Sequence, residues 1–553
     1  MFTMTRTYIF PQMNDTTKKF APDHFNDEEK LIEQTVEQFA AERVYPSLEK
    51  LESYDYATAR QLFEEAGELG LLGADVPEDY DGMEMGKKIS GLVAEGLGHG
   101  SSFGVSFNIH TGVGTLPYMY FGTPEQKKKC LPKLASGEWI GAYALTEPNA
   151  GSDALAAKAT AKLNDDGSYR LNGEKQWITN AHLANVYVVF AKTEEGMTAF
   201  IVERDMPGVS VGPEEQKMGI KGSSTATLIL EDVNVPEENI LGERGKGHYI
   251  ALNILNLARL KLAFSNIGSG KQAFNTALQY TQERKQFNRE LSQFSMLREK
   301  LAMMAASIYR AETGVYYTAR LIDEEDLSEE NILKVLPQYA ADCALNKVAA
   351  SEMLDYVVDE GVQMHGGYGY MEEYDIERMY RDARINRIFE GTNEINRLTV
   401  ARSITKLFAK DASVFEADDA LGNEQYNKAL AAFNKVMQTL TSEEVISLKE
   451  FENEQELMRL ISDTVMDLYL MKAVLIRVEE SKKRDIEQAL VAYITHDSSR
   501  KIQANLLEIT ARIAKDPAAL QGEIRDLTVD SVDLIGLKRQ IADYMIEKGS
   551  YSL

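Results

Sequence analysis

The stretch Ile388-Phe389-Glu390-Gly391-Thr392-Asn393-Glu394-Ile395-Asn396-Arg397 is the one around which the rest of the chain is interpreted. One carboxylate, Glu390, stands between an aromatic residue and a Gly-Thr pair. This pattern suits a base held on a tight connection, because the glycine leaves bare backbone beside it for the close approach of a ligand. An isolated Glu-Gly-Thr is more often an ordinary surface turn, so the accompanying motifs decide the interpretation.

Four motifs precede this stretch along the chain: Tyr143-Ala144-Leu145-Thr146-Glu147-Pro148-Asn149-Ala150-Gly151-Ser152-Asp153, Trp177-Ile178-Thr179, Arg284-Lys285-Gln286-Phe287 and Gln363-Met364-His365-Gly366-Gly367. Together and in this order they resemble the acyl-CoA dehydrogenase family, over roughly residues 27–405. The resemblance implies FAD as cofactor, an acyl-CoA thioester as substrate, and a helical, a β and a second helical domain. Most members of the family end near the position of residue 405. Residues 409–553 resemble the C-terminal extension of the very-long-chain acyl-CoA dehydrogenases.

The composition is that of a globular protein of about two to four domains, with 553 residues, 44% hydrophobic and 26% charged. The formal net charge of −26 argues against a nucleic-acid partner or an anionic membrane, since either would require a basic face. Two cysteines, Cys130 and Cys343, cannot build a disulfide framework or a thiolate metal site, and the seven histidines show no ligand spacing. We therefore expect no metal and a cytoplasmic protein, because the first residues resemble neither a signal peptide nor a transit peptide.

Hydrophobic periodicity predicts the domains of an α+β fold. Residues 1–26 are polar and contain prolines, which predicts a flexible arm. Helical spacing extends over 27–137, with an interruption at Gly100–Gly114 and a helix start at Thr123-Pro124. Over 138–245 the period changes to two, and strand-like runs at 187–191, 198–202 and 226–230 predict an antiparallel β domain. Helical periodicity returns over 246–408 and predicts a four-helix bundle that carries Glu390.

The end of the chain predicts a further helical domain. Residues 409–425 are small and acidic, which indicates a linker. Over 426–553 the pattern is helical, and one apolar stripe comprises Leu457, Leu460, Ile461, Val465, Leu468, Met471 and Leu475. We expect this extension to cover the face through which the family's cores commonly pair into tetramers, which would leave a homodimer. Membrane attachment is the alternative; the many acidic residues of 443–467 disfavour it, although Lys482-Lys483-Arg484 is a basic run.

Conversion of an acyl thioester to a trans-2-enoyl thioester needs a base for the α proton, hydrogen-bond donors to the thioester oxygen, and an acceptor for the β hydride. We assign the base to Glu390, with its backbone N–H and Gly391 at the thioester, and the hydride passing to flavin N5. The rival carboxylates are Glu147 and Glu394. The resemblance makes Glu147 structural and assigns Glu394, with Thr392, to the cofactor.

The resemblance further implies contacts to the flavin ring. Thr146 would bond the ring edge and Ser152 would face both cofactor and substrate, with Leu145 beside them. Trp177-Ile178-Thr179 would place an indole on the flavin face that the substrate does not use, with Thr179 near N5. A lone tryptophan is more often a core residue, so this assignment depends on the residues that follow it.

Contacts across a dimer interface are also implied. Arg284, Gln286 and Phe287 match residues that reach the FAD of a neighbouring subunit, and a guanidinium suits a pyrophosphate because it binds phosphate bidentately. Gln363, Gly366 and Gly367 would come from the same neighbour, and bare glycine backbone would admit the pyrophosphate closely. By itself Glu283-Arg284-Lys285 is typical of a solvated helix face.

For the CoA thioester, Asn256 and Arg259 match the family's pantetheine-contacting position and the arginine that follows it. Asparagine at the first position favours a long-chain substrate. The very-long-chain pattern has two glycines in the floor of the acyl pocket; this chain has Gly104 but Asn108 at the second, which leaves a medium to long chain open.

Three functions remain open at this point. The first is a dehydrogenase of fatty acid β-oxidation that passes electrons to electron-transferring flavoprotein. The second is an acyl-CoA oxidase, with oxygen as the acceptor, and the third is a non-catalytic scaffold on the same fold. The joint presence of Glu390, Thr146, Trp177 and Arg284 favours catalysis.

Overall fold

The computed structural model describes residues 20–98, 102–328, 330–410, 422–441, 448–480, 485–514, 516–527 and 532–553. Its internal contacts divide the chain into two compact units. Unit 1 comprises Met1–Asn26, Gly270–Leu321 and Gln338–Leu553, and unit 2 comprises Asp27–Ser269 and Ile322–Pro337. Most of the expected linker, residues 411–421, and the basic run Lys482-Lys483-Arg484 lie outside the described residues.

The first part of unit 2 is helical, as predicted. Its helices are α1 (Asp27–Phe39), α2 (Leu48–Glu52), α3 (Tyr56–Glu68), α4 (Gly86–Gly98), α5 (Ser102–Thr111), α6 (Leu116–Phe121) and α7 (Pro124–Ser136). The start of α7 is confirmed: Thr123 and Gln126 form a reciprocal capping box, and Pro124 occupies the first helical position. Phe63, Phe103 and Phe107 lie in the core of these helices.

The expected interruption at Gly100–Gly114 is wrong for residues 102–111, which form α5. Gly104 lies within this helix. The residue is a glycine because a side chain there would collide with the backbone of Leu97 in α4. The glycine therefore marks the close approach of two helices rather than a turn.

The second part of unit 2 is a sheet. Its strands are β1 (Gly141–Ala144), β2 (Thr160–Leu163), β3 (Tyr169–Thr179), β4 (Val186–Thr193), β5 (Gly196–Glu203), β6 (Val209–Val211), β7 (Thr225–Val235) and β8 (Ile240–Leu241). They pair in the order β6-β7-β3-β2-β4-β5-β8, and β1 also pairs with β4. The three strand-like runs fall within β4, β5 and β7, which confirms those predictions.

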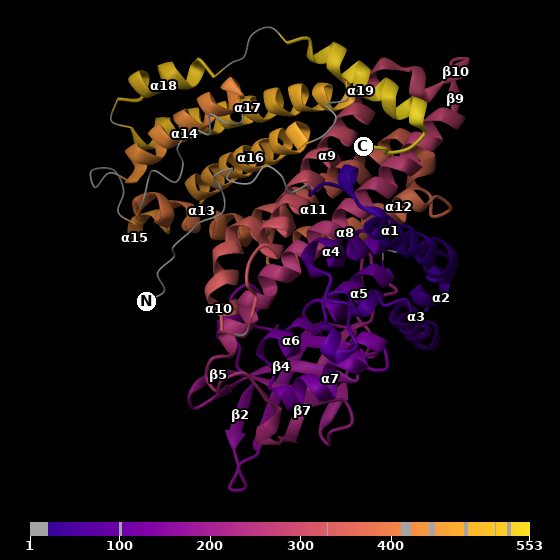
Figure 1. Ribbon diagram of the computed structural model, residues 1–553, viewed down its shortest axis with the longest axis vertical. Helices are drawn as coiled ribbons and strands as arrows, with labels where there is room; N and C mark the ends of the chain where they lie inside the picture. The colour runs from indigo at the N-terminus through magenta and orange to yellow at the C-terminus, as the bar shows by residue number, and fades with distance from the viewer. Residues whose placement is uncertain are drawn as a thin grey trace. The chain divides into compact units, whose positions relative to one another are not determined.

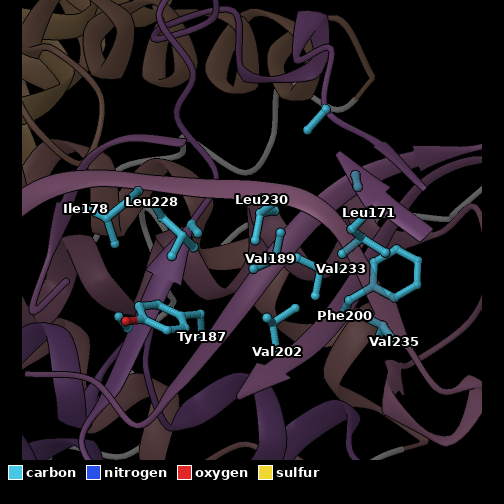
Figure 2. Close-up of a cluster of buried hydrophobic side chains, with 14 of the residues drawn as sticks. Leu171, Ile178, Tyr187, Val189, Phe200, Val202, Leu228, Leu230, Val233 and Val235 are labelled. Atoms are coloured by element: carbon cyan, nitrogen blue, oxygen red, sulfur yellow. The ribbon is translucent and has the colours of Figure 1, made fainter. Parts of the chain in front are cut away.

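The antiparallel prediction needs a correction, because β1 and β2 both run parallel to β4 and the sheet is mixed. The long segments that separate these strands return the chain to the same end of the sheet, whereas β4 and β5 are joined by a tight turn and pair antiparallel. Residues 186–191 of β4 and 197–202 of β5 are buried throughout, which explains their continuous apolar runs. Figure 2 shows Tyr187, Phe200 and Leu230 among the side chains of this core.

Unit 1 contains the predicted bundle. Its helices are the part of α8 (Gly247–Glu283) from Gly270 onward, α9 (Ser295–Asp323) up to Leu321, α11 (Ala340–His365), α12 (Asp375–Ala383) and α13 (Asn393–Lys410). A Cβ on Gly270 would lie 2.8 Å from the Met353 sulfur, so this glycine lets α8 approach α11 closely. These helices and the sheet confirm the α+β fold class.

The extension is helical in its described parts. It contains α14 (Glu424–Thr441), α15 (Leu448–Phe451), α16 (Gln455–Glu480), α17 (Asp485–Ile513), α18 (Pro517–Arg525) and α19 (Leu534–Lys548). The helices α14, α16 and α17 pack beside one another, and α16 also packs on α13 (Figure 1). The whole predicted apolar stripe of α16 is buried, and Gly314 of α9 makes room for Leu470.

Residues 20–26 do not form a loose arm. Phe20 and Phe25 are buried against Tyr317 and Tyr316 of α9. Asp23 accepts a hydrogen bond from Arg477 of α16 at 2.9 Å. The rest of the expected arm, residues 1–19, lies outside the described residues. Within the described part of the chain, no helix combines the length and apolar character needed to cross a membrane.

Candidate active site

Glu390 lies on a strained turn in unit 1. Its backbone has φ of 55°, in the left-handed region that residues with a side chain rarely adopt, and Gly391 follows with φ of 82°. The turn leads directly into α13, whose first turn is capped by the Thr392 hydroxyl accepting from the Ile395 N–H at 3.3 Å. Strained residues of this kind cluster at active sites and persist only where their surroundings hold them.

Two buried polar side chains donate hydrogen bonds to the turn. Lys347 of α11, which is fully buried, donates to the Gly391 carbonyl at 2.9 Å and to Asn393 Oδ1 at 2.8 Å. Asn396 donates to the same Gly391 carbonyl at 2.8 Å. Sequence reasoning missed Lys347 and Asn396. The repeated asparagines after Glu390 were visible, but the partner lysine is far away in the sequence.

The rival Glu147 is a structural carboxylate. It accepts hydrogen bonds from the Lys158 N–H at 2.5 Å, the Ala159 N–H at 2.9 Å and Lys175 Nζ at 2.7 Å. Burial alone would raise the pKa of Glu147, but these hydrogen bonds outweigh burial and hold its pKa below the ordinary value. Such a carboxylate is a weak base, and its role is to tie β3 to the residues that precede β2.

The second rival, Glu394, lies in the first turn of α13 and is exposed. Hydrogen bonds from its own backbone N–H and from the Thr392 hydroxyl lower its pKa. A lowered pKa and free access to water make Glu394 a poorer base than a carboxylate withdrawn from solvent.

The residues expected at the flavin ring gather in unit 2 around the end of β1 and one end of β3. The Leu145 carbonyl accepts from Lys175 Nζ at 3.2 Å, and the Thr146 carbonyl accepts from the Gln176 N–H at 2.9 Å. These bonds hold Thr146 beside Trp177. Ser152 follows in an exposed turn.

Trp177 is turned out of the sheet by a bulge. The pairing of β3 with β7 shifts register between Lys175 and Ile178, and Trp177 has φ of 59°. As a result its indole is 58% exposed, while Ile178 is buried and Thr179 continues the pairing with β7. An exposed indole on a strained bulge provides a flat apolar surface on which an aromatic ring can stack.

Asn256 and Arg259 lie one turn apart on the part of α8 that belongs to unit 2. Arg259 Nη1 donates to Asn256 Oδ1 at 2.8 Å, and both residues are buried. The structure therefore brings together the two residues expected at the pantetheine, and the bond fixes the direction of the asparagine amide.

The residues expected at the pyrophosphate also come together, in unit 1. Arg284, Gln286, Gly366 and Gly367 line one cavity of about 420 Å³. A Cβ on Gly366 or Gly367 would meet nothing within 4 Å, so the backbone there is open to a ligand. Gln363 is exposed one turn before these glycines.

The same cavity is lined by aromatic side chains that the sequence reasoning missed. The Tyr280 ring stacks on His365 with centroids 4.1 Å apart, and the Arg284 guanidinium lies over the Tyr368 ring at 5.3 Å. Tyr368 follows the Gly366-Gly367 pair directly, which is the signal that could have revealed it.

Phe287 stands at the tip of a hairpin formed by β9 (Lys285–Gln286) and β10 (Arg289–Glu290). Phe287 and Asn288 have φ of 51° and 63°, the conformation of a two-residue turn that usually contains glycine. The Phe287 ring is 87% exposed, which suits a residue that contacts another molecule.

These groups fit FAD by their chemistry. Thr146, Thr179 and Ser152 carry hydroxyls for the polar edge of a flavin, and Trp177 offers a face for the ring. The cavity with Arg284 combines a guanidinium, amides and open glycine backbone, the donors that a pyrophosphate requires.

Comparisons with known proteins show the family of the chain. The chain matches the models of the acyl-CoA dehydrogenase N-terminal domain at residues 26–138, the middle domain at 142–233 and the C-terminal domain at 245–405. A probable acyl-CoA dehydrogenase of Bacillus subtilis (strain 168) is 42% identical over 572 aligned positions, covering 97% of this chain and 96% of that protein. The very long-chain specific acyl-CoA dehydrogenase, mitochondrial, of Macaca fascicularis is 33% identical over 507 positions, covering 83% and 75%.

Among solved structures, an acyl-CoA dehydrogenase complexed with FAD from Bacillus anthracis has a TM-score of 0.92 at 42% identity, covering 99% of both chains. Both this structure and the Bacillus subtilis relative span the extension, so the extension belongs to a shared architecture. The scaffold alternative is not retained. The chain belongs to the acyl-CoA dehydrogenase family and is an FAD-dependent acyl-CoA dehydrogenase.

Proposed function

We propose that this protein oxidises medium- to long-chain fatty acyl-CoA to trans-2-enoyl-CoA in β-oxidation, in the cytoplasm, and passes the electrons to electron-transferring flavoprotein. The observation that carries the proposal is the turn of Glu390, which is strained and fixed by Lys347 and Asn396. The rival carboxylates are tied into structural hydrogen bonds or exposed to water.

In the proposed reaction the Glu390 carboxylate takes the α proton of the acyl thioester. The backbone N–H of Glu390 donates to the thioester oxygen and stabilises the charge that develops there. A rigid turn matters because a base displaced by about 1 Å can lose roughly 100-fold in rate. When bound, FAD supplies the acceptor for the hydride that leaves the β carbon.

Other residues of the chain bind and orient the cofactor and the substrate. Trp177 covers one face of the flavin, and the hydroxyls of Thr146 and Thr179 hold its edge. Arg284 binds the pyrophosphate, and the mutual hydrogen bond of Asn256 and Arg259 presents a fixed amide to the pantetheine.

The test is anaerobic bleaching of the flavin absorbance by an acyl-CoA. The wild-type protein is expected to bleach, and Glu390→Gln to retain FAD and bind acyl-CoA while bleaching about 10²–10⁴-fold more slowly, because only the proton acceptor is removed. Glu372→Gln, which changes an exposed carboxylate of the same unit, is the matched control. If Glu390→Gln slows the reaction less than about ten-fold, another residue is the base.

The electron acceptor is tested on the reduced protein. Rapid oxygen consumption by the acyl-CoA-reduced enzyme would replace the proposed acceptor with oxygen and make the protein an acyl-CoA oxidase. Slow reaction with oxygen and fast reoxidation by electron-transferring flavoprotein is the expected result.

We further propose a homodimer in which the Arg284 cavity faces a second copy. Exposed side chains near it support an interface: Phe287, Tyr370 and Met371 are 87%, 85% and 50% exposed. The buried stripe of α16 supports the idea that the extension covers the face used for tetramers in shorter relatives.

Mass measurement tests the assembly. A full-length dimer is expected, together with higher assemblies or aggregation when the chain is truncated after Lys410. A full-length tetramer, or a truncated chain that stays a well-behaved dimer, would contradict the covering role. Cosedimentation with anionic liposomes at moderate salt would favour membrane attachment instead.

A further inference from the structure

The extension is joined to the core of unit 1 by an ion-paired arginine. Arg397 of α13 donates from Nε to Asp463 of α16 at 2.6 Å. Its two terminal nitrogens bind the carboxylate of Glu352 in α11 at 2.6 and 2.9 Å. Burial alone would lower the pKa of Arg397, but the two carboxylates outweigh burial and raise it, so the guanidinium stays charged.

The same network continues to the turn of Glu390. Glu352 Oε1 also accepts from Asn393 Nδ2 at 3.1 Å. Asn393 Oδ1 in turn accepts from Lys347 Nζ, the group that donates to the Gly391 carbonyl. An unbroken path of hydrogen bonds therefore leads from Asp463 in the extension to the carbonyl of Gly391, the residue that follows Glu390.

The turn is the kind of element that depends on such support. Glu390 has a left-handed backbone, a conformation that is unfavourable for a residue with a side chain and persists only when the surroundings impose it. Glu352 must be oriented to serve Arg397 and Asn393 together, and Asp463 fixes the arginine from the other side.

We propose that Asp463 is a positioning residue for the base, so that the extension takes part in setting the geometry of Glu390. The inference rests on the proposed role of Glu390. Asp463 does not contact the turn and acts through Arg397, Glu352 and Asn393. The extension thus has a catalytic effect in addition to any effect on assembly.

Two further ion pairs between the extension and the core, chosen from several, supply matched controls. Arg310 of α9 pairs with Asp467 of α16 at 2.5 Å, one turn from Asp463 and well buried. Arg402 of α13 pairs with Glu452 at 2.8 Å on the surface. Neither pair has a recorded bond to Asn393, Lys347 or Gly391 among the described residues, so their loss should loosen the extension without moving the turn.

The experiment compares Asp463→Asn, Asp467→Asn and Glu452→Gln in the full-length, FAD-loaded protein. We expect Asp463→Asn to lower kcat about ten-fold with KM nearly unchanged, because an interaction with a charged group is lost from the support of the base. Hydrogen exchange of the peptide covering 388–397 should rise in the same variant. Asp463→Glu should restore most of kcat, since it keeps the charge.

The controls are expected to keep kcat and the exchange of 388–397, even where they lower the thermal midpoint. The proposal is overturned if Asp463→Asn matches the controls in both measurements, or if Asp467→Asn lowers kcat equally. Should Asp463→Asn fail to fold, Arg397→Lys carries the same comparison, because lysine cannot bind both carboxylates in the same way.

Glu390→Gln is measured alongside. If that variant stays active, the proposed base is wrong whatever Asp463→Asn does to kcat, and the exchange of 388–397 still reports the coupling. If Glu390→Gln is inactive and Asp463→Asn behaves like the controls, the base is right and the positioning role is refuted.

Discussion

Lys347→Met is the sharpest perturbation of the turn that carries Glu390. Methionine keeps an unbranched apolar side chain that matches the lysine stem up to Cε, and it lacks the ammonium group. In the wild-type protein this group is fully buried and donates to the Gly391 carbonyl and to Asn393 Oδ1 at 2.9 and 2.8 Å. The variant therefore deletes two hydrogen bonds to the turn without creating a large cavity.

The free energy lost in Lys347→Met can be estimated from the hydrogen bonds that the two acceptors keep. Hydrogen bonds that involve a charged group contribute about 1.5–3 kcal/mol each. The Gly391 carbonyl still accepts a hydrogen bond from Asn396 at 2.8 Å, and Asn393 Oδ1 still accepts one from the Ser351 hydroxyl at 3.3 Å. Since neither acceptor is left unsatisfied, we take the lower value for each bond, a loss of about 3 kcal/mol. If the whole loss falls on the productive conformation of the turn, kcat decreases by roughly 100-fold.

The assay is single-turnover bleaching of the flavin by an acyl-CoA, with the thermal midpoint measured in parallel. Lys300→Met is the control, because it removes an ion pair with Glu360 of the same helix α11 and leaves the turn untouched. The reasoning is refuted if Lys347→Met keeps kcat within about three-fold of the wild type, or if Lys300→Met loses as much.

Three further outcomes are expected. Arg284→Ala should lower FAD retention and the thermal midpoint together, since bound cofactor stabilises the folded state; an FAD-replete monomer in sedimentation would contradict the shared site. Lys87 and Lys261 outweigh burial and lower the pKa of Asp75 to about 2, so its contribution to stability is present above about pH 4 and is lost as the pH falls toward 2. Thermal unfolding should show Asp75→Asn destabilised at pH 7, with a difference from wild type that shrinks in acid; a constant difference would refute this. Neither amide atom of Asn108 has a hydrogen-bond partner among the described residues. In a chain-length series, Asn108→Gly should shift activity toward longer acyl-CoA chains. An unchanged profile would exclude Asn108 from the acyl pocket.

The sequence by itself determined the family, the fold class and the candidate site residues. The reason is that each motif is local: Glu390-Gly391-Thr392, Trp177-Ile178-Thr179 and Arg284 through Phe287 each carry their chemistry within a few residues. Helices and strands with strong periodicity were predictable for the same reason, including the capped start of α7 at Thr123.

The tertiary structure decided what depends on residues distant in the sequence. Gly104 looked like a helix breaker, but the backbone of Leu97 in a neighbouring helix requires a glycine there. The parallel pairing of β1 with β4 depends on how the chain returns to the sheet. The exposure of Trp177 depends on a bulge in β3. The support of Glu390 by Lys347, and through Arg397 by Asp463, exists only because packed helices bring these charges within hydrogen-bonding distance, which no local pattern encodes.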